Sequence, residues 1–274
     1  MTTGLIAGVR EKNPLVHCIT NYVTVNDVAN GLLAIGASPV MADAAEEAAV
    51  FGGVCDCLYI NIGTLNNAKV PAMRLAGEAA AAAGRPIVLD PVGVGATPYR
   101  METAQMLLEC LPVTLLRGNA SEIKALARAG AGARGVDAAA ADIVTEADIA
   151  GAADFACALS ERLGVVVSFS GAIDIIADAS TAYAVRNGVD MMPLVTGSGC
   201  VLSALAAAFL GAHAHAPLQA TVAAYTVMGL CGELAHANLR PGEGTGSFRA
   251  RMLDALYHMD DSALQAGMKV AQVR

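Results

Sequence analysis

Short apolar runs alternate with longer segments of helical periodicity along the first two thirds of the chain. The first six apolar runs lack a clean alternation of polar and apolar residues, as expected for strands that are covered on both faces. The expected strands are 15–19, 39–41, 58–62, 86–89, 113–116, 165–169, 173–177 and 181–185. The expected helices are 25–35, 44–50, 69–83, 99–110, 121–129 and 146–163. This order predicts an α/β fold with a mostly parallel, doubly wound central sheet and helices on both faces.

The pattern changes after the sixth strand. The last three strand-length runs follow one another without helices, which predicts an antiparallel edge hairpin near residues 173–186. Long helices are expected from about Gly199 and Pro217, and a C-terminal pair from Phe248. Residues 130–141 are expected to form a loop before a helix. Because no Pro/Ser-rich linker and no repeat period is visible, residues 1–274 are expected to form a single domain.

Residues 191–232 contain no Asp, Glu, Lys or Arg, which raises the question of a membrane span. A spanning helix needs about 20 consecutive, mostly apolar residues. Pro193, Ser198, His213 and Pro217 interrupt this run, so two buried helices are the better interpretation. The first eleven residues lack a basic start followed by a long apolar core, so no signal peptide is expected. We therefore expect a cytoplasmic protein without membrane contact.

Composition narrows the class of protein. The chain has 274 residues, 55% of them hydrophobic and 15% charged, with a net charge of -8. High hydrophobicity with low charge excludes a disordered chain, and the acidic balance disfavours a nucleic-acid binder. The seven cysteines form no CxxC pair, so buried thiols are expected, without a disulfide framework. No zinc site is expected from the five histidines, since even His213 and His215 would face different sides of a helix.

Polar residues or glycines follow each of the first six expected strands. In open parallel sheets, ligands bind beyond the carboxyl ends of the strands. The segments at these exits are 20–22, 41–43, 61–65, 90–93, 117–122 and 170–171. Turns favour Gly, Asn and Pro in any case, but they explain Arg117 and Glu122 less well. The exits therefore predict a ligand site along this edge of the sheet.

Three charged residues at these exits suggest phosphate and metal binding. Asp90 directly follows an apolar strand, where its carboxylate can hold Mg²⁺ through water or simply bond its own turn. Arg117 can grip phosphate oxygens with two parallel hydrogen bonds. Glu122 stands near a helix N-terminus, where it can serve a metal or act as an ordinary cap.

The segment Val195-Thr196-Gly197-Ser198-Gly199-Cys200 leads into an apolar helix. Its two glycines allow close approach of an anion, and the helix N-terminus supplies unpaired N–H groups. Such a loop suits an oxyanion or a transferring phosphoryl group. Cys200 would lie in the first helical turn, where thiol pKa values fall, so it could serve as a base or nucleophile. The alternative is a buried cysteine beside an ordinary glycine turn.

Several familiar motifs are absent. No GxxxxGK[ST] sequence occurs, which excludes a standard P-loop. Gly93-Val94-Gly95 follows a strand, but Pro98 stands where a third small residue would be required for a dinucleotide site. The missing GxSxG elbow weakens an α/β-hydrolase interpretation.

A longer set of segments, in order and spread over most of the chain, carries a resemblance. They are NPLVHCITNYVTVNDVANGLLAIGASPVMADAAEEA (13–48), INIGTLN (60–66), PIVLDPVGVGATPYR (86–100), LLRGNASEI (115–123), GVD (135–137) and DMMPLVTGSGCVLSALAAAF (190–209). The chain resembles the hydroxyethylthiazole kinases of the thiamine pathway, which have a ribokinase-like fold. Coverage is weakest at 138–165 and in the C-terminal tail.

The resemblance implies an activity and an assembly. The expected reaction is ATP-dependent phosphorylation of the hydroxyl of 4-methyl-5-(2-hydroxyethyl)thiazole, in thiamine biosynthesis and salvage. The resemblance also implies Mg²⁺ as cofactor, ATP as co-substrate, and a homotrimer with its sites at the subunit interfaces.

The resemblance also implies roles for individual residues. The residues expected to line the thiazole pocket are Asn21, Val23, Met41 and Gly197. Those expected to hold ATP are Arg117, Asn119 and Ser170. Asp90 and Glu122 would organise Mg²⁺ and its waters. The catalytic anion hole would comprise Gly197, Gly199 and Cys200, with Cys200 where the wider ribokinase-like group usually has a catalytic Asp.

Three alternatives remain open at this point. The first is another kinase of the same fold, for hydroxymethylpyrimidine or a sugar, although Val23 and Met41 favour an apolar heterocycle. The second is an acyl transferase with Cys200 as nucleophile, which needs a base that no histidine motif supplies. The third is a non-catalytic sensor, which would not need the expected phosphate and metal groups.

Overall fold

The structure is a computed structural model that describes residues 4–129 and 144–274. The expected loop at 130–141, with the motif at 135–137, lies outside the described residues. One sheet of the described chain has the strand order β2-β1-β3-β4-β5-β6-β7-β8-β9. The strands are β1 (Leu15–Ile19), β2 (Ser38–Val40), β3 (Cys57–Asn61), β4 (Ile87–Asp90), β5 (Leu115–Asn119), β6 (Val166–Ser170), β7 (Asp174–Ala177), β8 (Ala182–Val185) and β9 (Val270–Gln272).

The sheet is mostly parallel, as predicted. Strands β1 to β6 pair in parallel, and β6-β7, β7-β8 and β8-β9 pair antiparallel. The chain first runs from β1 outward to β2 and then returns to β3 on the other side of β1. This reversal of direction is a topological switch point, and in open α/β sheets ligands bind at such a point, beyond the carboxyl ends of the strands.

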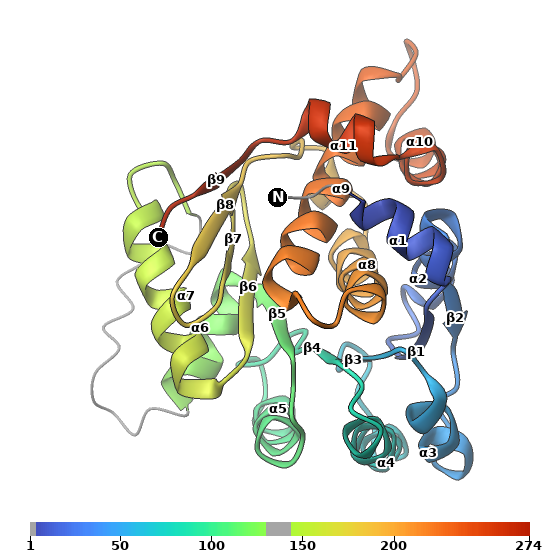
Figure 1. Ribbon diagram of the computed structural model, residues 1–274, viewed down its shortest axis with the longest axis vertical. Helices are drawn as coiled ribbons and strands as arrows, with labels where there is room; N and C mark the ends of the chain where they lie inside the picture. The colour runs from blue at the N-terminus through green and yellow to red at the C-terminus, as the bar shows by residue number, and fades with distance from the viewer. Residues whose placement is uncertain (1–3, 130–143) are drawn as a thin grey trace.

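Helices cover both faces of the sheet (Figure 1). On one face lie α1 (Leu5–Lys12), α2 (Val25–Ile35), α8 (Ser198–Ala212), α9 (Pro217–Ala237), α10 (Thr245–His258) and α11 (Asp261–Gly267). On the other lie α3 (Ala45–Val54), α4 (Lys69–Ala82), α5 (Pro98–Cys110), α6 (Ala120–Ala129) and α7 (Ile149–Leu163). Successive side chains of a strand enter opposite layers: in β3, Cys57 and Tyr59 join the core under α8, and Leu58 and Ile60 join the other core.

The uncharged stretch forms the centre of the first layer. Helix α8 is buried from Val201 to Gly211 and contacts β1, β3 and β4, and α9 packs beside it. Alanines on these helices permit close packing against the sheet, so the run is apolar because it is enclosed by protein. Within the described parts of the chain, no helix is long and apolar enough to cross a membrane.

The antiparallel hairpin is present, but the prediction that it forms the sheet edge is wrong. The C-terminal strand β9 pairs with β8 and becomes the edge. Its three residues are too short to produce a visible pattern in the sequence. Helix α1 was also not foreseen, and the helix expected from residue 146 begins at Ile149. Five of the seven free cysteines are buried, as expected, whereas Cys110 is exposed and Cys200 partly exposed.

Candidate active site

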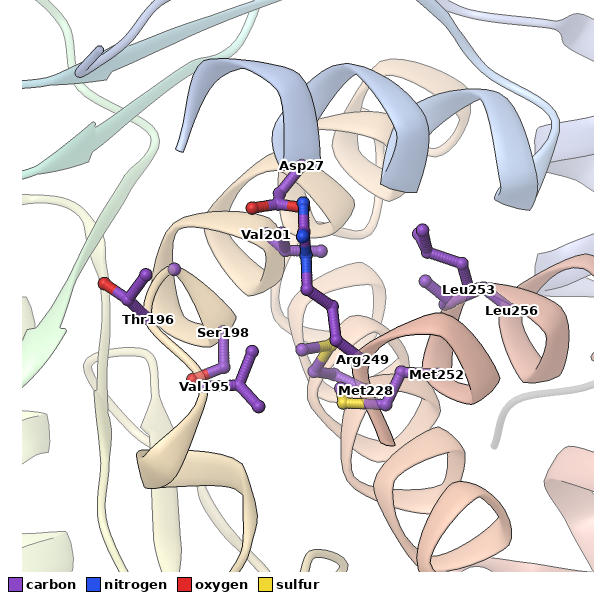
Figure 2. Close-up of a pocket in the computed structure, with 11 residues that line it drawn as sticks. Asp27, Val195, Thr196, Ser198, Val201, Met228, Arg249, Met252, Leu253 and Leu256 are labelled. Carbon is purple, nitrogen blue, oxygen red and sulfur yellow. The ribbon is translucent and has the colours of Figure 1, made fainter. Parts of the chain in front are cut away.

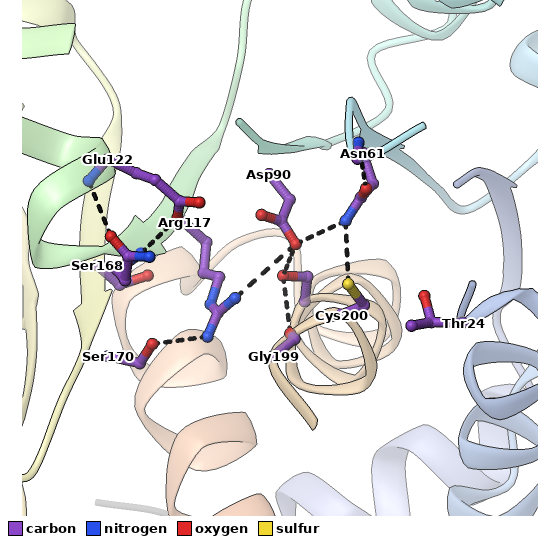
Figure 3. Close-up of polar contacts among 12 residues, drawn as sticks. Thr24, Asn61, Asp90, Arg117, Glu122, Ser168, Ser170, Gly199 and Cys200 are labelled. Carbon is purple, nitrogen blue, oxygen red and sulfur yellow. Dashed lines mark hydrogen bonds and ion pairs between the residues drawn. The ribbon is translucent and has the colours of Figure 1, made fainter. Parts of the chain in front are cut away.

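The strand register brings the predicted polar exits together. Asn61 at the end of β3 pairs with Asp90 at the end of β4, and Asn119 of β5 pairs with Ser170 of β6. The first turn of α8 lies against these ends, so that residues distant in sequence surround one space (Figure 3). This edge of the sheet is the candidate site.

Asp90 is the most buried member of this group. Its side chain has no exposed surface, and its Oδ2 accepts hydrogen bonds from Asn61 Nδ2 at 2.9 Å and Ser203 Oγ at 2.7 Å. The Tyr59 hydroxyl lies 3.3 Å from the same oxygen. Because every one of these donors comes from another element, the interpretation of Asp90 as a turn residue that bonds its own backbone is not supported.

The second oxygen of Asp90 is buried and accepts no hydrogen bond from the residues that the structure describes. Burial raises the pKa of Asp90 to about 6, against the opposing effects of Arg117 and Ser203. A buried carboxylate with a free lone pair is costly unless a cation or donor completes it. Asp90 is therefore arranged to receive a positively charged or proton-donating ligand.

Arg117 lies beside Asp90 and is also buried. Its Nη2 donates to Ser170 Oγ at 2.8 Å, and its Nη1 lies 3.8 Å from Asp90 Oδ2. Burial disfavours the guanidinium charge, but Tyr225 and Asp90 outweigh this effect and raise the pKa of Arg117. The site thus holds a permanent cation whose Nε has no acceptor within the described part of the chain. The predicted pair Arg117 and Ser170 is brought together.

Asn119 and Glu122 form a reciprocal cap at the start of α6. Asn119 Oδ1 accepts from Glu122 N, and Glu122 Oε2 accepts from Asn119 N, both at 2.8 Å. Glu122 Oε1 accepts a further bond from Gly93 N at 2.7 Å, which fastens the loop after β4. The charge of Glu122 also raises the pKa of Asp90, because the two carboxylates repel each other. The capping alternative for Glu122 is confirmed, and the same side chain faces the site.

The loop before α8 requires its glycines. Gly197 has φ 90°, and a Cβ there would lie 2.6 Å from Thr24 Cγ2. A Cβ on Gly199 would lie 2.9 Å from Arg117 Nη1, so the α8 backbone approaches the guanidinium directly. No side chain caps the helix, and its first backbone bond runs from Val201 N to Gly197 O. The Ser198 amide donates to Val195 O at 3.5 Å, so among the described residues the amides of Gly199 and Cys200 are the ones available to an anion.

The Cys200 thiol is held by two amide side chains. Asn21 Nδ2 lies 3.2 Å and Asn61 Nδ2 lies 3.4 Å from its sulfur. The expectation that the thiol pKa falls here is wrong: burial and the nearby Asp90 charge raise it. At a helix N-terminus the dipole favours a thiolate, but here desolvation and a neighbouring carboxylate are stronger.

Three of the four residues expected around the thiazole, other than Gly197, differ in their surroundings. Asn21 is buried and reaches both Cys200 and Asn61, while its Oδ1 accepts from the backbone and hydroxyl of Thr24. Val23 is 63% exposed. Met41 is half-buried and packs against the core under α8. The structure thus joins Asn21 to the central group, whereas the side chain of Val23 faces solvent.

Four residues of the site were not predicted. Tyr59 and Ser203 bond Asp90, Tyr225 bonds Ser168 beside Arg117, and Arg100 donates to the carbonyls of the β3 and β4 exits. Some signal existed for the first two. Tyr59 precedes Asn61 by two residues on a strand, and Ser203 follows Cys200 by three on a helix, so each pair shares a face. Tyr225 and Arg100 gave no such signal.

A small cavity lies on another side of the Gly197 loop (Figure 2). Its volume is about 30 Å³, and its lining is mostly apolar, with the Asp27–Arg249 ion pair at its rim. Of the predicted site residues, Gly197 lines it. Neither Asp90 nor Arg117 contributes, so this cavity is distinct from the polar centre.

A magnesium ion is compatible with the residues present. In residues 4–129 and 144–274, no three His, Cys, Asp or Glu side chains are grouped to enclose a metal. Mg²⁺ in phosphate-transferring sites does not need such an enclosure, because it binds one or two carboxylates, waters and substrate phosphates. The unpartnered Asp90 oxygen, with Glu122 nearby, supplies this kind of donor set.

The fold places the protein in a broad class. A solved pyridoxal kinase from Staphylococcus aureus in complex with ADP superimposes with a TM-score of 0.61 at 15% identity, covering 94% of this chain and 98% of that one. At this identity the likeness concerns the fold alone. A mostly parallel sheet with its polar site at the strand ends and an anion-ready helix is the ribokinase-like class.

The relatives at higher identity narrow this class. The family model described as the hydroxyethylthiazole kinase family matches residues 6–262, and the chain belongs to this family. It is 47% identical over 259 residues to the hydroxyethylthiazole kinase of Clostridium acetobutylicum, covering 94% of this chain and 95% of that one. The corresponding values for Desulfovibrio desulfuricans are 46% over 274 residues, 97% and 96%. A solved hydroxyethylthiazole kinase protein from Pyrococcus horikoshii OT3 has a TM-score of 0.86 at 36% identity, with 98% of both chains covered.

Proposed function

We propose that this protein is an ATP-dependent kinase that phosphorylates the hydroxyl of 4-methyl-5-(2-hydroxyethyl)thiazole in thiamine biosynthesis and salvage. The observation that carries the proposal is the approach of the α8 N-terminus to the Arg117 guanidinium, with Asp90 beside both. Phosphoryl transfer needs alignment and charge neutralisation far more than covalent chemistry. A buried cation and free helix amides at one point supply the neutralisation.

We propose the following roles for the site residues. Arg117, Ser170 and Asn119 hold the ATP phosphates, with Arg117 fixed by its neighbours before any nucleotide arrives. The amides of Gly199 and Cys200 receive the charge that grows on the transferred group. Asn21, Val23, Met41 and Gly197 bind the thiazole alcohol, with its hydroxyl directed toward Cys200.

Magnesium is the proposed cofactor, held by Asp90 and Glu122 and by their waters. When bound, it neutralises the phosphate oxygens of ATP. Asp90 meets this need because burial leaves one of its oxygens without a donor from the described residues. Glu122 also holds the loop that follows Asp90 in place, because its carboxylate accepts a hydrogen bond from Gly93 N.

Cys200 acts in this proposal as a neutral thiol. Its raised pKa keeps the proton on sulfur near neutral pH. A loose transition state lets the alcohol keep its proton until late, so a strong base is not required. The same raised pKa argues against the acyl-transferase alternative, which requires a thiolate nucleophile.

The proposed setting is a cytoplasmic homotrimer in which each chain acts as one kinase domain. The exposure of Val23, two residues after Asn21, supports a shared pocket, because a second subunit there would cover an apolar side chain that otherwise faces water.

Product identification tests the proposal. The protein is incubated with Mg-ATP and the thiazole alcohol, and the phosphate ester is sought by mass spectrometry. We expect the thiazole phosphate and ADP in equal amounts. No ester from this alcohol, together with an ester from hydroxymethylpyrimidine, would instead assign the protein to the pyrimidine kinases.

A further inference from the structure

Lys69, at the start of α4, is a buried cation beside the candidate site. Only 3% of the Lys69 surface is exposed. Its Nζ donates to the carbonyl oxygen of Thr20 at 2.7 Å and lies 3.2 Å from Asp43 Oδ2. The same Nζ lies 3.6 Å from the centre of the Tyr22 ring. One ammonium group therefore binds the loop after β1 twice and the loop after β2 once.

The three partners compensate the burial of the charge. Removing an ammonium group from water costs free energy unless hydrogen-bond acceptors or an opposite charge replace the lost water. Here the ammonium group has a carbonyl as hydrogen-bond acceptor, a carboxylate as ion-pair partner and an aromatic ring as cation–π partner. The backbone of Lys69 is itself anchored, since its N–H donates to Asn66 Oδ1 at 3.0 Å. The cation is thus a fixed point to which two loops are attached.

Each partner is a sequence neighbour of a residue proposed to bind the alcohol. Thr20 directly precedes Asn21, and Tyr22 directly precedes Val23. Asp43 follows Met41 by two residues. Movement of these partners would therefore move Asn21, Val23 and Met41, including the amide of Asn21 that reaches Cys200.

The nucleotide side is built from other elements. Arg117 and Ser170 lie on β5 and β6, and no partner of Lys69 comes from those strands. Loss of the Lys69 charge should therefore affect one substrate and spare the other.

We infer that Lys69 is a positioning residue for the alcohol, which it orders by joining the loops after β1 and β2. This inference rests on the proposed alcohol pocket. Lys69 acts through Thr20, Tyr22 and Asp43 and has no contact with the reacting groups. Its effect is expected in the KM for the alcohol, with smaller changes in kcat and in the KM for ATP.

The first test compares Lys69→Met with Lys69→Arg. We expect Lys69→Met to raise the KM for the thiazole alcohol about tenfold, which corresponds to one lost charge-assisted contact. The KM for ATP should stay within about twofold. Lys69→Arg keeps the charge and should recover part of the loss. Lys269→Met is the control, because Lys269 also pairs with a carboxylate, Glu233 at 2.8 Å, but directly precedes β9, at the opposite end of the strand order from β1 and β2. It should leave both KM values unchanged.

A second pair of variants does not depend on a buried substitution. Tyr22 is 61% exposed, so its replacement endangers the fold less. Tyr22→Phe keeps the aromatic face and should match the wild type, whereas Tyr22→Leu should raise the KM for the alcohol. In a Lys69→Met background, Tyr22→Leu should add little, because the cation it serves is gone. A full additional effect would mean that Tyr22 acts independently of Lys69 and would overturn the inference.

Val23→Ser and Asn21→Ala separate this inference from the proposed pocket. If both raise the KM for the alcohol and Lys69→Met does not, the inference about Lys69 is wrong and the pocket stands. If neither raises it, the pocket assignment itself fails. Equal increases in the KM values for alcohol and ATP after Lys69→Met would show a general structural role and would also overturn the inference.

Discussion

The surroundings of the Cys200 thiol oppose its ionisation on balance. Burial and the charge of Asp90 raise its pKa, while hydrogen bonds with Thr24 and Asn21 and the charge of Arg117 only partly offset this increase. Burial likewise raises the pKa of Asp90, to about 6, which is closer to neutral pH than is usual for a carboxyl group. At the residue scale, the site contains ionisable groups whose pKa values are shifted by burial, as is typical of sites that bind charged ligands.

Cys200→Ala should leave measurable kinase activity. The thiol lies in the first turn of α8, but its raised pKa keeps it protonated near neutral pH and unable to accept a proton, so its loss should lower kcat by about one to two orders of magnitude at most. Steady-state rates of phosphate ester formation check this. A variant that binds both substrates and yet has no activity would show that the base is essential.

Gly199→Val should abolish activity. A side chain at this position would collide with the Arg117 guanidinium, which is buried and held by Ser170. The added carbons would also occupy the space through which the γ-phosphate approaches. Gly151→Val is the control, since no atom lies within 4 Å of a Cβ there. Activity in Gly199→Val near that of the control would refute the assignment of the loop.

Asp90→Asn should change the pH dependence of stability. Burial raises the pKa of Asp90 to about 6 from a usual value of 3.8, so the folded protein retains a proton that the unfolded chain has already lost. The free energy of unfolding should therefore decrease as pH rises from about 4 to about 6, by up to about 3 kcal/mol from this group. Asparagine cannot titrate, so the variant should lack this component.

Urea unfolding at several pH values, without nucleotide or magnesium, compares the two proteins. The difference between them should grow in favour of Asp90→Asn as pH rises. Parallel curves from pH 4 to 7 would show that the carboxyl of Asp90 is not perturbed.

The elements that could be predicted are those with a strong local pattern. The parallel strands and the helices between them follow from apolar runs and periodicity, and so do the buried α8 and α9. Strand β9 and helix α1 could not be predicted, because their short segments are defined by contacts with distant parts of the chain. Element ends shifted by a few residues for the same reason.

The packing of α3 on α4 gives a prediction at this scale. A Cβ on Gly52 would overlap the Ala76 carbonyl and lie 2.9 Å from Ala76 Cα, whereas one on Gly53 would meet no atom within 4 Å. Gly52→Ala should therefore lower the free energy of unfolding by about 1–3 kcal/mol. Gly53→Ala should leave it unchanged or raise it by up to about 1 kcal/mol, through reduced entropy of the unfolded chain. Denaturant unfolding of the two neighbours decides, and equal effects would contradict the close packing.

For the whole molecule, the sequence indicated the location of the site better than the hydrogen bonds and contacts within it. The exits of the strands pointed to Asp90, Arg117 and Glu122 because parallel strands end at one edge. The bond from Ser203 to Asp90 and the role of Lys69 depend on helices that meet those exits only in three dimensions. Residue types and spacing could not reveal the raised pKa of Cys200, since it depends on how deeply the fold buries the thiol.

The proposed homotrimer is testable by mass in solution. Sedimentation equilibrium should give three times the mass of one chain, and Val23→Asp should weaken the assembly, because a charge would replace an apolar side chain in a buried contact. Val23 is 63% exposed in the single chain, so this change should not unfold it. A monomer at micromolar concentration would contradict a shared site.

The central claim is that the buried carboxylate at the end of β4 and the groups around it perform the phosphoryl transfer. The most direct measurement is the rate of thiazole phosphate formation by Asp90→Asn at saturating Mg-ATP and thiazole alcohol, in the folded variant characterised by urea unfolding. We predict a loss of at least about a hundredfold relative to the wild type, as for removal of a key electrostatic group in an active site. A rate within about threefold of the wild type would place the chemistry elsewhere in the molecule.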